Sequence, residues 1–114
     1  MKIVKEQVTL EELKKMAEKM FGDMVKAVVD IEKEIMVVDA DMHADEEALL
    51  LESGSEQNNL WGINLHPEEK NSEEWIEFDS MINLRPSWGN KSRGVDDPKI
   101  QEIIKKIVNK LVTK

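Results

Sequence analysis

The 114-residue sequence contains no cysteine and no tyrosine, and its only aromatic residues are two phenylalanines and three tryptophans. The absence of cysteine excludes a disulfide framework, a thiolate zinc site and a cysteine nucleophile. The absence of tyrosine removes a common acid–base group. No Gly-x-Ser-x-Gly motif occurs, and the two histidines show no local triad pattern. The sequence therefore offers little for nucleophilic catalysis.

Long apolar segments are also missing. No stretch approaches the roughly 18 consecutive apolar residues that a membrane-spanning helix needs. Residues 1–6 mix apolar and charged side chains and lack the apolar run of a signal peptide. We therefore expect a cytoplasmic protein with no membrane partner.

Charge is abundant but uneven. Charged residues make up 35% of the sequence and the formal net charge is −8. Residues 85–114 hold eight basic and three acidic residues, a net charge of +5, so the remaining 84 residues carry −13. Such asymmetry indicates a polyanionic partner. The alternative, which we favour because the basic helix must pack somewhere, is that this helix packs on the protein's own acidic sheet.

Two helices are predicted from their caps. Thr9 and Glu12 form a capping-box pattern that begins a helix over residues 10–21, and Gly22 is suited to end it. Asp97 followed by Pro98 begins a second helix. Its apolar stripe consists of Ile100, Ile103, Ile104, Ile107, Val108 and Leu111.

Alternating or β-branched segments predict strands at residues 3–4, 24–38, 48–51, 60–65 and 75–85. Residues 39–45 are predicted to be a polar connection. The element order is then β-α-β-β-β-β-α. Short connections between strands favour a mostly antiparallel sheet of about five strands, with the two helices on one face. The length fits one domain, so we expect residues 1–114 to form a single α+β domain.

The loop 85–94 is the first candidate site. It contains basic residues, glycines and hydroxyl or amide groups but no acid, and a helix N-terminus follows it. Exposed backbone amides and guanidinium groups suit a phosphate or sulfate. The candidate ligand-binding residues are Arg85, Ser87, Asn90, Lys91, Ser92 and Arg93. The alternative is an ordinary surface loop with solvated basic side chains.

Two acidic clusters are further candidates. Glu77, Asp79, Asn83 and Arg85 share one face of the predicted strand 75–85 and can hold a metal or position a substrate; the alternative is a solvent-facing surface. The second cluster lies in the predicted connection and comprises Asp39, Asp41, His43, Asp45, Glu46 and Glu47. Its oxygens and imidazole suit a divalent cation, but its spacing is not that of an EF-hand. We assign no metal ligand and no cofactor.

The three tryptophans stand out in this aromatic-poor sequence. Trp61 and Trp75 lie in predicted strands and are expected to pack, whereas Trp88 lies inside the basic loop. An exposed aromatic ring among basic residues is typical of a site that stacks a nucleobase. It is also typical of a hydrophobic anchor for a protein partner.

Three segments carry a resemblance that covers nearly the whole chain. They are residues 25–30 (VKAVVD), residues 43–51 (HADEEALLL) and residues 83–95 (NLRPSWGNKSRGV). They resemble a family of short prokaryotic proteins described only as a domain of unknown function. The resemblance implies a basic residue at the place of Lys91 and, more often, a polar residue at that of Trp88. It brings no activity, cofactor or catalytic residue.

Three functions follow as hypotheses. The leading one is a small binding module for a phosphate-bearing ligand, a nucleotide or nucleic acid, held by the loop 85–94. The second is a small hydrolase or metal-dependent enzyme that uses Asp79 or Glu77. The third is a protein-interaction or homo-oligomer-forming domain.

Overall fold

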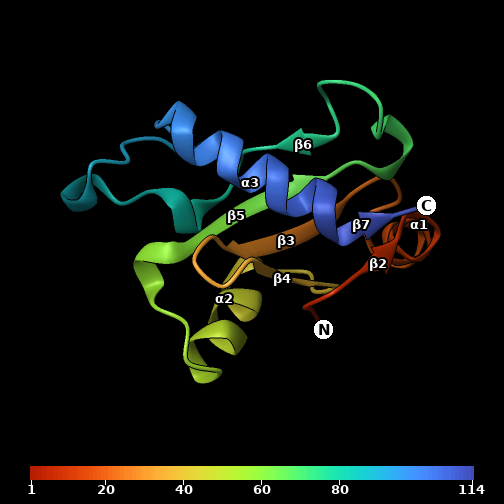
Figure 1. Cartoon of the computed structure of the whole chain (residues 1–114), viewed down its shortest axis with the longest axis horizontal. Helices are drawn as coiled ribbons and strands as arrows, with labels where there is room; N and C mark the ends of the chain where they lie inside the picture. Colours follow the sequence, from red (N-terminus) through yellow and green to blue (C-terminus); the bar gives the residue numbers. More distant parts are fainter.

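The computed structural model of the protein describes residues 1–114 and confirms an α+β fold built on a five-stranded antiparallel sheet (Figure 1). The sheet order is β1-β4-β3-β5-β6. Its strands are β1 (Lys2–Val4), β3 (Val25–Asp30), β4 (Ile35–Val38), β5 (Leu60–Leu65) and β6 (Ile76–Glu77). A separate pair joins β2 (Val8–Thr9) and β7 (Val112–Thr113) in parallel.

The two predicted helices are confirmed. Helix α1 (Leu10–Met20) begins at a complete capping box between Thr9 and Glu12. Helix α3 (Pro98–Leu111) begins at Asp97, whose side chain accepts a hydrogen bond from the Lys99 backbone amide. Both start signals are local contacts within three residues, which explains why they are legible in the sequence. No helix of the protein has the length and apolar character to cross a membrane.

The prediction of one strand over residues 24–38 is wrong, because the segment is the hairpin β3–β4. The Asp30 carboxylate accepts hydrogen bonds from the backbone amides of Glu32 and Lys33 at 2.9 and 3.0 Å, which closes the turn. Glu34 then adopts a left-handed φ of 56°. Beyond the turn the faces exchange, so that Met36 rather than Val37 lies in the larger core.

The predicted strand 48–51 is also wrong. These residues belong to helix α2 (His43–Glu52), which begins inside the segment expected to be a polar connection. The buried residues of α2 are His43, Glu46 and Leu50, spaced three and four apart as a helix requires. Because two of them are polar, the helical period is hidden in the hydrophobic pattern. The run of leucines then imitates a buried strand.

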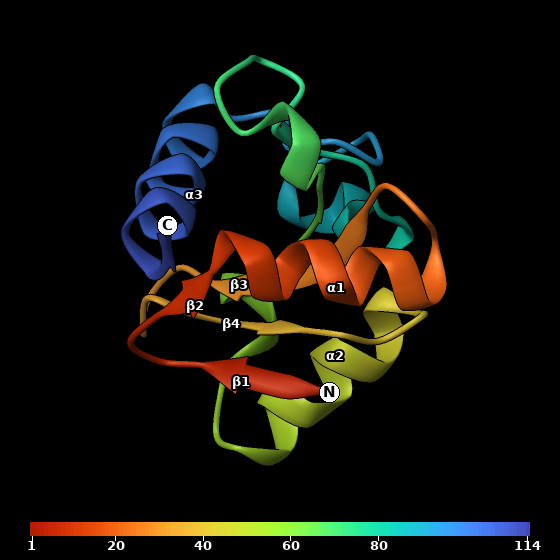
Figure 2. The same ribbon diagram turned by 90° about the vertical axis from the view of Figure 1, so that its right-hand side faces the viewer.

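The sheet separates two cores. Helices α1 and α3 cover one face and α2 covers part of the other, as Figure 2 shows. The larger core holds 20 buried residues, mainly from α1, α3 and the sheet, with others from the β2–β7 pair and from the segments at Trp75 and Val95. The smaller core lies between α2 and the sheet and holds Val28, Val37, Leu50 and Leu60. The two predicted helices thus share a face, as expected, and the third helix shields the opposite face.

The prediction of a long strand over 75–85 is wrong beyond its first residues. Only Ile76 and Glu77 pair with β5, and a 3₁₀ helix, η3 (Met81–Asn83), follows. The Asn83 side chain accepts from the Gly62 backbone amide at 2.8 Å and donates to the Gly62 carbonyl oxygen at 2.9 Å. One side chain therefore satisfies the edge of β5 where a further strand would otherwise pair.

Candidate functional site

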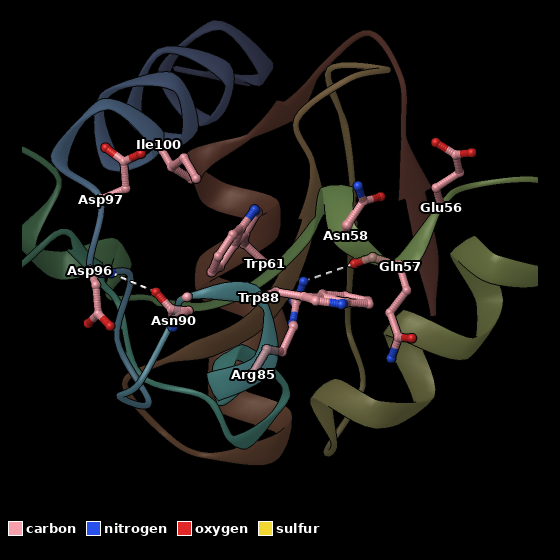
Figure 3. A pocket seen from close by; sticks show the side chains of 11 residues that line it. Glu56, Gln57, Asn58, Trp61, Arg85, Trp88, Asn90, Asp96, Asp97 and Ile100 are labelled. Atoms are coloured by element: carbon pink, nitrogen blue, oxygen red, sulfur yellow. Dashed lines mark hydrogen bonds between the residues drawn. The ribbon is translucent and has the colours of Figure 1, made fainter.

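A pocket of about 670 Å³ opens where the start of α3 meets two short 3₁₀ helices, η1 (Gln57–Asn59) and η4 (Pro86–Trp88) (Figure 3). Trp61 and Trp88 supply its aromatic surface, and the Arg85 guanidinium lies beside both rings and reaches Gln57 of η1 (Figure 3). The remaining lining is mostly polar: Glu56, Gln57, Asn58, Gly89, Asn90, Asp96, Asp97 and Ile100.

Trp61 carries an unpartnered donor in this pocket. Its side chain is 6% exposed, and its Nε1–H has no hydrogen-bond acceptor in the protein. Figure 3 shows the indole nitrogen between Ile100 and Asn58. A buried donor without an acceptor costs about 1–3 kcal/mol. The Trp75 indole, in contrast, donates to Asn109 Oδ1 at 3.0 Å.

Arg85 is fixed in place by backbone carbonyls rather than by carboxylates. Its Nε donates to the Ile82 oxygen at 2.9 Å and Nη1 to the Gln57 oxygen at 3.0 Å, and Nη2 donates to the Leu60 oxygen. Its guanidinium carbon lies 4.6 Å from the ring centroid of Trp61 and 5.6 Å from that of Trp88, within cation–π range.

The charge of Arg85 persists although burial lowers the pKa of its guanidinium. The group has five N–H donors, of which these carbonyls use three. Arg85 therefore brings a positive charge and two further donors to the pocket.

The loop 85–94 is closed on itself by Asn90. This buried side chain donates to the carbonyl oxygens of Asn83, Ser92 and Gly94 at 2.7, 3.1 and 2.8 Å. Its Oδ1 accepts from the Asp96 backbone amide at 2.8 Å. All its polar atoms are used within the protein, so its role in the structure is to shape the loop.

An internal carboxylate takes up the donors that we expected to face an anion. Asp96 accepts a hydrogen bond from the Lys91 backbone amide at 2.6 Å and another from the Ser92 hydroxyl. These bonds, with the Ser92 hydroxyl having the largest effect, hold the pKa of Asp96 below its usual range. The loop 85–94 contains no acidic residue. Asp96, two residues beyond its end, folds back onto the loop and supplies a negative charge.

The six predicted ligand-binding residues are not gathered at one point. Arg85 and Asn90 line the pocket beside α3. Arg93 lines a different pocket and forms an ion pair with Asp79, Nε to Oδ1, at 2.8 Å. Ser87 and Lys91 are exposed, and Ser92 is bound to Asp96.

Residues 56–61 were not singled out in the sequence as part of a site. In the sequence, the segment Glu56–Asn58 shows only the residue types of a turn, and Trp61 is interpreted as a packing residue. The one available signal is a run of amides next to a tryptophan. That signal is too common to locate a pocket, because the partner residues Arg85 and Trp88 come from a distant part of the chain.

The acidic row of the predicted strand is dispersed as well. Glu77 accepts a hydrogen bond from Asn64 Nδ2 at 3.0 Å and contacts His66 Nε2 at 3.1 Å. These two contacts hold the pKa of Glu77 below its usual range, and the hydrogen bond from Asn64 has the larger effect. The lowered pKa makes Glu77 a weaker base. His66 thus has a partner that is not apparent from its sequence neighbours. No group of three or more His, Asp or Glu side chains is placed to hold a metal ion.

A family model with the description "Protein of unknown function (DUF5674)" matches residues 2–111. The chain belongs to this family. The match spans nearly the full length, so both the pocket beside α3 and the loop 85–94 lie inside the family's domain. Comparison with curated proteins found no match. Comparison with solved structures found none either.

Proposed function

We propose that this chain is a small binding module whose pocket beside α3 receives a nucleobase, carried by a free nucleotide or exposed in a nucleic acid. The observation that carries this proposal is the buried Trp61 Nε1–H in the wall of a pocket of about 670 Å³; it lacks an acceptor and is closed to solvent, so a base reaches it by displacing the side chains over it. A base carbonyl or ring nitrogen is a planar acceptor of the kind that this donor lacks.

Polar groups around Trp61 match the edges of a base. The side chains of Gln57 and Asn58 form no hydrogen bond to the protein through their amide groups, and both line the pocket. Such amides pair with a base edge through one donor and one acceptor. Arg85 adds two free donors, and the carboxylates of Asp96 and Asp97 can accept from an exocyclic amino group.

An aromatic ring completes the pocket. Trp88 is 56% exposed, and its ring lies beside the Arg85 guanidinium (Figure 3). Stacking of a base on such a ring contributes about 1–3 kcal/mol. The N–H of Trp61 and the charge of Arg85 determine which polar groups of a ligand the pocket accepts. Stacking on Trp88 then adds affinity for such a ligand.

The phosphate contributes less than the base in this proposal. Glu56, Asp96 and Asp97 place three carboxylates around the pocket against the single cation of Arg85. Lys91 is exposed and forms no ion pair, so it remains able to contact a phosphate outside the pocket. We therefore expect nucleosides to bind, with a modest and salt-dependent gain from a 5′-phosphate.

The test is a calorimetric titration with the common nucleosides and their 5′-monophosphates at two salt concentrations. We expect at least one nucleoside to bind and the variant Trp88→Ala to lose about tenfold or more in affinity, since stacking is worth about 1–3 kcal/mol. Trp61→Phe keeps the ring and removes the N–H. It should weaken binding several-fold, in line with about 0.5–1.5 kcal/mol for a hydrogen bond.

The matched control is Trp75→Phe, which removes an indole N–H that already has a protein acceptor outside this pocket. Its affinity for the nucleoside should equal that of the wild type. Equal affinities in wild type, Trp88→Ala and Trp61→Phe would contradict the proposal, as would the absence of any nucleoside binding. Binding that needs the phosphate and vanishes in high salt would instead favour the basic loop 85–94 as the determinant.

The other two hypotheses remain predictions. An enzyme that uses Glu77 or Asp79 gains no support from their contacts, because Glu77 has a lowered pKa and Asp79 is bound to Arg93. A homo-oligomer-forming role and a cytoplasmic location also stay expectations from the sequence.

A further inference from the structure

A second pocket lies on the other face of the sheet, at the N-terminus of α2. Its volume is about 320 Å³, and it brings together parts of the chain that the sequence separates: Lys26 on β3, His43 on α2, Asn64 on β5, and Asp79 and Arg93 from the segment after β6. One residue from each acidic cluster and one from the basic loop therefore meet at a single place.

The N-terminus of α2 has no side-chain cap. Its N-cap residue is Met42, which offers no acceptor to the first backbone amides, and Met42, His43 and Ala44 all line the pocket. The first turn of a helix presents unpaired N–H groups and a partial positive charge. The corresponding positions of α1 and α3 are capped by Thr9 and Asp97. Among the three α-helices, only α2 has no side chain that caps its first backbone amides.

Two cations border the same pocket. Lys26 is half-buried and forms no ion pair. Arg93 uses its Nε for Asp79, which leaves both terminal nitrogens of the guanidinium without a protein acceptor. Lys26 and Arg93 together outweigh Asp79 by one positive charge. With the uncapped helix, this favours an anionic group in the pocket.

The pocket also holds acceptors that lack donors. Asn64 is 6% exposed; its Nδ2 donates to Glu77 and to the Asp79 carbonyl oxygen, and its Oδ1 has no partner. His43 Nε2 lies 2.8 Å from the Ile63 carbonyl oxygen and must donate to it, so its Nδ1 carries a lone pair and no partner. Burial lowers the pKa of His43, which keeps the ring neutral near pH 7.

A ligand must therefore offer negative charge and a hydrogen-bond donor close together. We propose that this pocket binds a small carboxylate with a hydroxyl or amino group on the neighbouring carbon. The carboxylate faces the N-terminus of α2 and Lys26, and the hydroxyl or amino group donates to the unpartnered His43 Nδ1. Inorganic phosphate is the competing ligand to test, because near pH 7 it also combines negative charge with a hydroxyl donor but lacks the planar carboxylate.

The experiment is an amide NMR titration of the full chain with four probes: glycolate, glycine, acetate and inorganic phosphate. We expect saturable shifts of the His43 and Ala44 amides with glycolate or glycine. Acetate has the charge but no neighbouring donor, so it should bind at least about fivefold more weakly, the equivalent of about one hydrogen bond. Absence of saturable shifts, equal binding of acetate, or tighter binding of phosphate would each overturn the assignment.

Two variants separate binding from folding. Met42→Asp places a carboxylate at the open N-cap, which should stabilise α2 and abolish binding of the better probe. Lys26→Met removes the unpaired charge and should weaken binding about fivefold. The control Lys106→Met makes the same change at an exposed, unpaired lysine of α3 and should leave affinity unchanged. Unaltered binding in Met42→Asp or in Lys26→Met would refute the site, whatever the outcome of the nucleoside titrations.

Discussion

At the scale of the residue, the most unusual side chain is Glu46. It is completely buried on the inner face of α2, and neither carboxyl oxygen has a hydrogen-bond partner in the protein. Burial raises its pKa from 4.5 to about 10 and outweighs the opposing effects of the Ala40 backbone and Lys26. The carboxyl is therefore protonated in the folded protein at neutral pH, whereas it is ionised in the unfolded chain.

This difference predicts a pH-dependent loss of stability. Between about pH 4.5 and 10 the folded state binds one more proton at Glu46 than the unfolded state. The contribution of Glu46 to the free energy of unfolding therefore falls as pH rises, by up to about 1.4 kcal/mol per pH unit. Glu46→Gln keeps the shape and removes the ionisation. We expect it to raise the free energy of unfolding by about 2–3 kcal/mol at pH 7 and by more at pH 8.

Urea unfolding followed by circular dichroism between pH 7 and 9 measures this effect. The window avoids the opposite effect of His43, whose lowered pKa makes stability rise with pH up to about its ordinary value of 6.5. A constant difference between Glu46→Gln and wild type across this window would show that Glu46 is ionised in the folded protein.

At the scale of the element, the segment after β6 depends on single asparagines. Asn83 is fully buried and bonds to both backbone groups of Gly62 and to the Arg93 carbonyl oxygen at 3.0 Å. Asn90 then ties Asn83 to the end of the loop. These side-chain bonds hold a long irregular segment against β5, which positions Arg85 in one pocket and Arg93 in the other.

Asn83→Ala should therefore be strongly destabilising. It leaves both backbone groups of Gly62 without partners, each worth about 1–3 kcal/mol, whereas the Arg93 carbonyl oxygen keeps its bond from the Ser80 amide, so we expect a loss of at least about 2 kcal/mol in the free energy of unfolding. The control Asn71→Ala, at an exposed residue that makes no side-chain hydrogen bond, should change stability by less than about 0.5 kcal/mol. Urea titration compares the two. A loss below about 1 kcal/mol for Asn83→Ala would mean that water or a shifted loop replaces these bonds.

The elements also show where sequence patterns succeed. Helices α1 and α3 were predictable because their caps are local and their buried faces are apolar. Helix α2 and the segment 78–85 were not, because polar residues such as His43, Glu46 and Asn83 occupy buried positions. The sequence alone does not distinguish a buried polar residue from an exposed one. Its burial is decided by partners from elsewhere in the chain.

At the scale of the whole molecule, the sheet is buried on both sides by helices that come from different parts of the chain. Strands β3 and β5 form its centre and pair along their entire lengths, six residues each. Strand β1 is an edge, and β6 is an edge with only two paired residues. Protection from solvent should follow this order, since opening the centre requires separating both cores.

Amide hydrogen exchange tests this arrangement. We expect the amides of Ala27, Val29, Ile63 and Leu65 to exchange only through global unfolding, with free energies equal to that from urea titration. Amides of β1 and of residues 66–74 should exchange through smaller openings. If β3 exchanged as fast as β1, the sheet would not be the common wall of two cores.

The sequence by itself determined the fold class, the two capped helices, the strand 60–65 and membership of a family without a known activity. These follow from short-range patterns: caps, apolar periodicity and chemical composition. Only the tertiary structure decided where the charges lie. It joined Asp96 to Lys91 and Ser92, Arg93 to Asp79, and Arg85 to two tryptophans. The Asp79–Arg93 and Trp61–Arg85 pairings depend on which distant residues the sheet and its two cores bring together, and no local pattern encodes that distance. The contacts of Asp96 depend on how the irregular loop folds, which its sequence pattern does not specify either.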